Sequence, residues 1–344
     1  MLLRKSVSLE STIRSSDITP QHVYEEYKEE SKAEYKEQSK QPHPTNRRRF
    51  LTGAATLGAA TLAARYIPNL ISPGATVHAA DQLTTTPGKY TLNEPQTPLG
   101  KASNYNNFYE FGTDKSDPAH NAGKLKTRPW PIQITGMVKK PQTINIDDLL
   151  HYRPLESRIY RHRCVEAWSM VIPWDGYSLS EFINFCEPLP SAKFVQFITL
   201  ADRKQMPLPG GYDWPYSEGL RLDEAMNPLA LLTFGCYGQT LPNQNGAPIR
   251  VVSPWKYGFK NGKSIVAFKF LDKMPHTTWN QINSDEYGFY SNVNPTVDHP
   301  RWTQARERRI DSSLLPHTIP TQMFNGYSDQ VASLYTGMNL KRFY

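Results

Sequence analysis

A cysteine among charged residues is the feature of the sequence best suited to chemistry. Cys164 follows Arg161, His162 and Arg163, and Glu166 comes two positions later. Thiolate is the form of cysteine that binds a metal or attacks an electrophile, and neighbouring guanidinium groups favour it by opposite-charge attraction. Cys164 is therefore a candidate metal ligand or nucleophile. The alternative is a buried structural cysteine, since free cysteines often behave as small hydrophobes.

The residues around Cys164 indicate how it is presented. Alternation of apolar and charged residues over 157–164 predicts a short strand that ends at the cysteine. Trp168, Pro173 and Trp174 then predict a rigid, apolar wall. In an extended segment Glu166 shares a face with Cys164, so we expect it near the reactive sulfur, with an influence on proton delivery. The alternative is that Glu166 pairs with one of the two flanking arginines.

The run R-C-V-E-A-W-S-M-V-I-P-W, residues 163–174, resembles the metal-binding segment of the sulfite-oxidase-fold molybdoenzymes. It is most similar to one branch, the catalytic subunits of periplasmic protein-methionine-sulfoxide reductases, and the resemblance extends from about Tyr105 to the C-terminus. It implies an α+β molybdopterin-binding fold with mixed sheets, short helices and long loops. It also implies one Mo-molybdopterin per chain, with Cys164 as the single protein ligand of the metal; soft sulfur donors suit such a site.

The resemblance also assigns residues to the pterin and its phosphate. They lie in N-N-F-Y-E-F-G (106–112), at the end of a strand, in Q-N-G-A-P-I-R (244–250) and in W-K-Y-G-F-K-N-G-K-S-I (255–265): Asn106, Tyr109, Glu110, Thr199, Asn245, Arg250, Asn261, Gly262 and Lys263. Asn245 can donate and accept at a heterocycle edge, and Arg250 can fork onto phosphate oxygens. Gly262 permits close backbone approach and Lys263 adds charge. Without the resemblance, a turn residue, a core aromatic and solvated cations explain Asn106, Tyr109 and the two basic residues.

The same stretch nearly spells a nucleotide-binding loop. Gly258, Gly262, Lys263 and Ser264 have three positions between the glycines, whereas a P-loop needs four. The following residues alternate like a strand, although a P-loop must open a helix. We therefore exclude ATP or GTP binding by this segment.

Composition limits the possible classes. The chain has 344 residues, a net charge of +7 and three cysteines. It lacks the Lys/Arg runs of a nucleic-acid binder, and three cysteines do not build a disulfide scaffold. Cys186 follows apolar residues at helical spacing and Cys236 lies in an apolar run, so we expect both to pack in the core.

The chain divides into three parts. Residues 1–45 form a polar extension with no sign of a site. Residues 46–80 fit a twin-arginine export signal, with Arg47 and Arg48 before a short, weakly apolar segment at 50–64 and small residues near Ala80. We expect the mature protein to begin near residue 81 as a single catalytic domain over 81–344. The predicted location is the periplasm, reached through the twin-arginine export machinery.

Short elements are predicted throughout this domain. Expected strands cover 128–138, 192–200, 229–237, 249–253 and 264–270, and expected helices cover 179–186, 222–226 and a short turn capped by Asp147. They do not alternate as regular βαβ units, which favours a mixed α+β fold.

The chain carries no C-x-x-C-H motif, no cysteine set for an iron–sulfur cluster and no G-x-G-x-x-G. Electrons for a redox metal must therefore come from another protein, and the resemblance implies a haem-binding integral-membrane partner. The predicted reaction is reduction of methionine sulfoxide in oxidised periplasmic proteins by oxygen-atom transfer to molybdenum, with loops at 206–216 and 279–290 around an open site. The alternatives are sulfite oxidation or reduction of a small S- or N-oxide on the same fold. A third is an exported binding protein without enzymatic activity.

Overall fold

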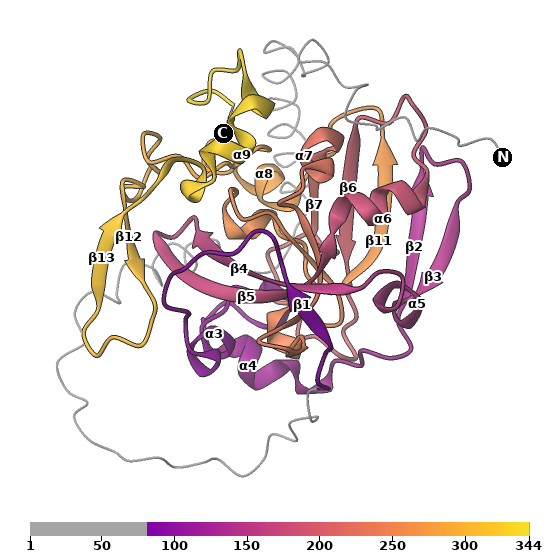
Figure 1. Cartoon of the computed structure of the whole chain (residues 1–344), viewed down its shortest axis with the longest axis horizontal. Coiled ribbons are helices and arrows are strands. Elements are labelled where there is room, and N and C mark those ends of the chain that lie inside the picture. The colour runs from indigo at the N-terminus through magenta and orange to yellow at the C-terminus, as the bar shows by residue number, and fades with distance from the viewer. Residues whose placement is uncertain (1–80, 344) are drawn as a thin grey trace.

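The computed structural model describes residues 81–343, and the predictions for residues 1–80 lie outside this range. Two β-sheets frame the molecule, and a long ribbon of β4 and β5 runs across its middle (Figure 1). The eight-stranded sheet is built from β1 (Thr85–Pro87), β4 (Leu155–Cys164), β5 (Trp168–Ser178), β8 (Leu231–Cys236), β9 (Gln239–Thr240), β10 (Arg250–Val252), β12 (Arg306–Arg309) and β13 (His317–Pro320).

β5 is the centre of this sheet. Its sequence is mostly apolar, and its first ten residues are all buried, Ser169 and Asp175 among them, as expected of a strand covered on both faces. One edge pairs antiparallel with β4. The other edge is divided, because β12 pairs with its first two residues and β8 with its last five. The β12–β13 hairpin therefore lies beside the end of β5 where the candidate cysteine sits.

The second sheet has the order β3–β2–β11–β6–β7. Its strands are β2 (Pro131–Gly136), β3 (Gln142–Asn145), β6 (Phe194–Thr199), β7 (Ser217–Arg221) and β11 (Ile265–Leu271). The central strand β11 is parallel to β2 and antiparallel to β6. Where β2 ends, Gly136 has φ +80°, and a Cβ there would lie 2.2 Å from the Phe270 carbonyl oxygen, so this crossing requires glycine.

Helices are short and lie between the strands. They are α3 (Leu99–Asn104), α4 (Asp117–Asn121), α5 (Ile146–Leu150), α6 (Leu179–Cys186), α7 (Leu222–Met226), α8 (Thr278–Ile282) and α9 (Ser328–Val331), with 3₁₀ turns η3 (Tyr109–Phe111), η4 (Ala122–Lys124), η5 (Asn243–Asn245), η6 (Gly258–Lys260), η7 (Met323–Gly326) and η8 (Ala332–Tyr335). Within residues 81–343, no helix is long and apolar enough to span a bilayer. Mixed sheets with short helices confirm the α+β prediction.

Most predicted elements are found close to their expected bounds. The strand leading to Cys164 is β4, and α6 covers the predicted helix at 179–186. Asp147 is not a cap, because it lies inside α5 and Asn145 occupies the capping position. Cys186 and Cys236 are 2% and 3% exposed and unpaired, which confirms their packing role.

Candidate active site

A tight turn at the end of β4 carries the two residues of greatest chemical interest. Cys164 pairs with Trp168 across the β4–β5 ribbon, and the Ala167 N–H donates to the Cys164 carbonyl at 3.2 Å. Ala167 adopts φ +57° to close the turn. Glu166 therefore lies in a turn and not in the extended segment that was predicted, yet its carboxylate comes to 3.8 Å from the Cys164 sulfur.

This turn opens into a pocket formed by segments far apart in the sequence. Eight of the predicted site residues line it: Asn106, Tyr109, Glu110, Cys164, Glu166, Asn245, Arg250 and Lys263. The fold thus brings the thiol, the two asparagines and the two cations of the prediction into one cavity.

Three predicted cofactor residues do not line the pocket. Thr199 donates to Glu110 Oε1 at 3.0 Å, and Asn261 Oδ1 accepts from the Ser253 N–H at 2.8 Å. At Gly262 a Cβ would lie 3.1 Å from Cβ of Phe197. The close approach at this glycine is therefore to a packed side chain, and these residues support the lining rather than form it.

The Cys164 thiol is buried, and its surroundings disfavour the thiolate form. Asn107 Nδ2 and the Glu166 N–H each donate to the sulfur at 3.4 Å. Burial, followed by the charge of Glu166, raises the pKa of the thiol to about 12. The expectation that flanking guanidinium groups lower this pKa is wrong in net effect, because strand alternation turns Arg161 and Arg163 away from the pocket. A bound metal cation would reverse the balance, since it deprotonates a coordinating thiol.

Glu166 is held as a carboxylate by neighbours that the sequence did not reveal. Lys115 Nζ lies 2.8 Å from Oε2, Asn107 Nδ2 donates at 3.0 Å and Trp168 Nε1 donates at 3.1 Å. Burial alone would raise the pKa of this carboxyl, but Lys115 and the hydrogen bonds together hold it below its usual range. The alternative pairing of Glu166 with Arg161 or Arg163 is wrong, because Lys115 takes that place.

The lining of the pocket also carries positive charge, from the buried Arg250 and the half-buried Lys263. Among residues 81–343, neither Arg250 nor Lys263 forms an ion pair. Burial lowers the pKa of Lys263 to about 8 and that of Arg250 to about 10, and it lowers the pKa of His162, which also faces the pocket, to about 3. His162 is therefore neutral near pH 7, whereas Arg250 and Lys263 are cations that need a negative partner.

Several polar atoms of the lining have no hydrogen-bond partner within residues 81–343. They are Asn107 Oδ1, Trp174 Nε1, Asn245 Oδ1 and Arg250 Nε, and all four are buried, although buried polar groups normally find hydrogen bonds. They offer both donors and acceptors, as the edge of a pterin requires. With a soft sulfur and unpaired cations in the same cavity, the residues fit molybdopterin with its phosphate.

Aromatic residues flank the same pocket. Tyr109 packs edge-on against Trp279 with ring centroids 5.1 Å apart, and Trp279 lies 4.9 Å from Tyr287. Tyr216, Trp279 and Tyr287 come from the two loops predicted as a rim, and all three line the pocket. The lining residues not foreseen include Asn107, His162 and Phe259. Asn107 adjoins a predicted residue, and strand alternation with Cys164 would have pointed to His162.

Comparison with known proteins gives the family of the chain. A family model described as an oxidoreductase molybdopterin binding domain matches residues 120–279. Together with the donor set of the pocket, this match defines the chain as a molybdopterin-dependent oxidoreductase.

Curated relatives specify the reaction class. The chain is 53% identical to the protein-methionine-sulfoxide reductase catalytic subunit MsrP of Ralstonia nicotianae, over 96% of each chain. It is 50% identical to MsrP of Burkholderia mallei over the full length of both, and 57% identical to MsrP of Pseudomonas syringae pv. tomato over 77% of this chain and 81% of the relative. The chain belongs to the family of protein-methionine-sulfoxide reductase catalytic subunits, and it is an enzyme acting on a sulfur group. This excludes the alternative of a binding protein without activity.

A likeness among solved structures is weaker. The sulfane dehydrogenase SoxCD of Paracoccus pantotrophus matches with a TM-score of 0.36 and 20% identity, over 43% of this chain and 40% of that one. A score this low carries no argument here.

Proposed function

We propose that this enzyme repairs methionine sulfoxide in oxidised periplasmic proteins, with electrons supplied by a haem-binding integral-membrane subunit. The observation that supports it most directly is the joining of a buried thiol, unpaired cations and an aromatic flank in one pocket. Methionine oxidation is a common and reversible lesion, so an exported repair enzyme has substrate to act on.

Different residues of the pocket would bind different parts of the cofactor. Cys164 would ligate the metal, Arg250 and Lys263 would neutralise the phosphate, and Asn245 with Trp174 would meet the pterin edge. When bound, molybdopterin supplies the two-electron oxygen-atom-transfer chemistry that amino-acid side chains lack. We propose one cofactor per chain, and the gathering of these residues in one pocket supports this number.

Glu166 and Lys115 would hold and transfer protons beside the Cys164 sulfur. Reduction of a sulfoxide to a thioether and water consumes two electrons and two protons. Lys115, within 2.8 Å of the Glu166 carboxylate, gives the pocket a proton-holding pair near the reacting centre. Asn107 donates to both the carboxylate and the Cys164 sulfur, so it fixes their relative orientation.

The aromatic flank of the site favours the sulfoxide of a methionine side chain over sulfite. The Glu166 carboxylate lies 3.8 Å from the Cys164 sulfur and is paired with Lys115, so this part of the pocket, within residues 81–343, offers no unpaired cation to an anionic substrate. Tyr109, Trp279 and Tyr287 offer aromatic surface, on which a methionine side chain packs favourably.

A direct assay tests the activity. The purified, molybdenum-loaded enzyme is given a reduced viologen dye and an oxidised, Met-rich protein, and repair is followed as the mass loss of one oxygen per methionine. The same preparation is tested for sulfite oxidation. Faster sulfite turnover, with no repair of the protein, would favour the alternative function on the same fold.

Location and electron supply need separate tests. We propose export through the twin-arginine machinery, read from Arg47 and Arg48. Replacing both with Lys is expected to leave folded, loaded enzyme in the cytoplasm, and normal arrival of the double variant in the periplasm would contradict the proposal.

The proposed electron donor is tested with quinol-reduced membranes that contain the haem-binding subunit. Its haem should be reoxidised when enzyme and oxidised protein are added together, and not when either is omitted.

A further inference from the structure

The carbonyl groups of the catalytic turn are held from behind by a distant segment. The Val165 carbonyl accepts from Trp302 Nε1 and from Gln304 Nε2, each at 2.8 Å. The Ala167 carbonyl accepts from the Arg308 N–H at 2.9 Å. Residues 302–308 therefore determine the path of the chain between Cys164 and β5.

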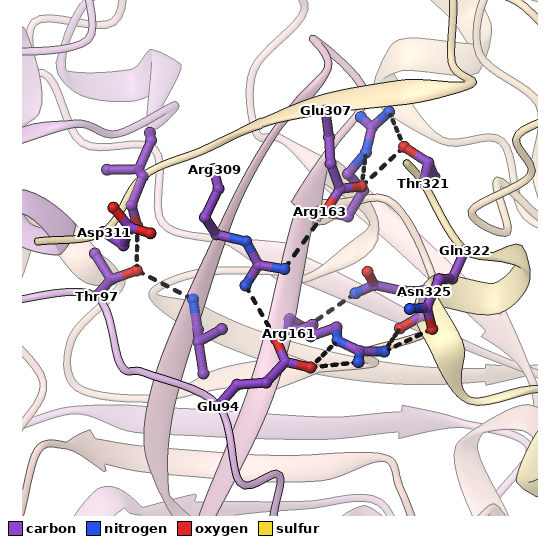
Figure 2. Close-up of polar contacts among 12 residues, drawn as sticks. Glu94, Thr97, Arg161, Arg163, Glu307, Arg309, Asp311, Thr321, Gln322 and Asn325 are labelled. Atoms are coloured by element: carbon purple, nitrogen blue, oxygen red, sulfur yellow. Dashed lines mark hydrogen bonds and ion pairs between the residues drawn. The ribbon is translucent and has the colours of Figure 1, made fainter. Parts of the chain in front are cut away.

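Arg163 completes this arrangement from the face of β4 that points away from the pocket. It is fully buried, and its Nη1 donates to the Cys164 carbonyl. Its other nitrogens donate to Glu307 at 2.8 Å, Gln304 Oε1 at 2.9 Å and Thr321 at 3.2 Å. Figure 2 shows the guanidinium between Glu307 and Thr321. The first and second carbonyls of the turn are thus joined through one arginine and one glutamine.

Arg161 is a natural comparison within the same strand. It shares a face of β4 with Arg163 and bonds to Glu94, Gln322 and Asn325 (Figure 2). Arg309 links the two arginines, because its guanidinium lies 3.4 Å from Glu94 Oε2 and 3.8 Å from Glu307 Oε1 (Figure 2). Arg163 bonds to the turn directly, whereas Arg161 is connected to it through this chain of ion pairs.

We propose that Arg163 and Gln304 are positioning residues that hold the turn so that the Cys164 sulfur and the Glu166 carboxylate keep their relative placement. The proposal rests on the assignment of Cys164 as the metal ligand. Arginine suits the role, because its planar fork donates in several fixed directions at once, whereas lysine offers a point charge. Gln304 suits it because its amide accepts from Arg163 with one atom and donates to Val165 with the other.

The first experiment measures the turn without the cofactor. Gln304→Glu keeps the size of the side chain and the acceptor for Arg163, but it loses the donor to the Val165 carbonyl. Hydrogen exchange of the Glu166 and Ala167 amides in cofactor-free protein should become about tenfold faster, as expected for the loss of one buried hydrogen bond. The melting temperature should change little, because a new ion pair with Arg163 offsets the loss. Arg161→Lys should leave these two amides unchanged.

The second experiment measures the metal site. In molybdenum-loaded protein, Gln304→Glu and Arg163→Lys should change the electron paramagnetic resonance signal of the metal and lower kcat with little effect on KM, while Arg161→Lys changes neither. An unchanged signal in both variants, or equal exchange rates in Gln304→Glu and wild type, would overturn the proposal. Absence of molybdenum from the wild type would instead refute the ligand assignment, and the exchange rates would still decide whether these residues hold the turn.

Discussion

Replacement of Lys263 by Met should have opposite effects on the empty and the loaded enzyme. Lys263 is half-buried and faces the pocket, next to Arg250 and without an ion pair among residues 81–343. Burial and the charge of Arg250 lower its pKa from 10.5 to about 8. This difference corresponds to about 3 kcal/mol of unfavourable free energy in the folded, charged form. Water in the pocket screens part of it, so the cofactor-free Lys263→Met variant should be more stable by about 1–3 kcal/mol at pH 7.

The pH dependence of stability is a second test of whether the charge of Lys263 destabilises the cofactor-free fold. Between about pH 8 and pH 10.5 the unfolded chain binds more protons at Lys263 than the folded chain does. The stability of the cofactor-free wild type should therefore rise with pH across this window, and the rise should be smaller in Lys263→Met. Below pH 8 the penalty is fully present in the wild type, and above pH 10.5 it has disappeared.

Urea unfolding of both cofactor-free proteins at pH 7 and pH 10 measures these differences. Lys269→Met, on an exposed position of β11, is the matched control and should stay within about 0.5 kcal/mol of wild type. In the loaded enzyme Lys263→Met should instead retain less molybdenum, because a phosphate has lost a cationic partner. If cofactor-free Lys263→Met were less stable than wild type, the Lys263 charge would not be destabilising in the empty pocket, and the reasoning would be refuted.

Three further outcomes are expected. Cys164→Ser should bind little molybdenum while it keeps its fold, measured by metal analysis beside circular dichroism, because a hydroxyl is a harder and less acidic donor than a thiol; wild-type metal content would contradict the ligand assignment. Glu224→Gln should lose about 3–5 kcal/mol of stability in urea unfolding, because Lys256, at 2.6 Å and fully buried like Glu224, loses its counter-charge; a double change of the pair to Leu and Met should recover much of this loss. Gly136→Ala should cost more stability than Gly211→Ala, since both have positive φ but a Cβ at Gly211 would meet nothing within 4 Å; equal melting temperatures would show that the contact with Phe270 relaxes freely.

Local patterns predicted the elements that carry the site. Alternation placed a strand before Cys164, and it ends at that residue. Apolar spacing placed α6 with the correct bounds. The same alternation also implied that Arg161 and Arg163 face away from the sulfur, so sequence proximity was a poor guide to electrostatics there.

The partners of the site residues were not predictable, because they come from distant parts of the chain. Lys115 is 51 residues from Glu166, and Gln304 is 139 residues from Val165. A lysine and a glutamine in loops carry no periodic signal that marks such a contact. The resemblance indicated eight of the lining residues. Thr199 and Asn261, which it also named, support the lining through hydrogen bonds that the motif alone does not describe.

The support of the turn by residues 302–308 has a consequence for how the enzyme is made. A ribosome synthesises Cys164 long before Gln304 and Arg308, and during that interval the carbonyls of the turn lack their distant donors. The turn can therefore take its final shape only after residues 302–308 have been synthesised and have packed behind it. Loading with the cofactor at this turn would then follow the arrival of that segment and not precede it.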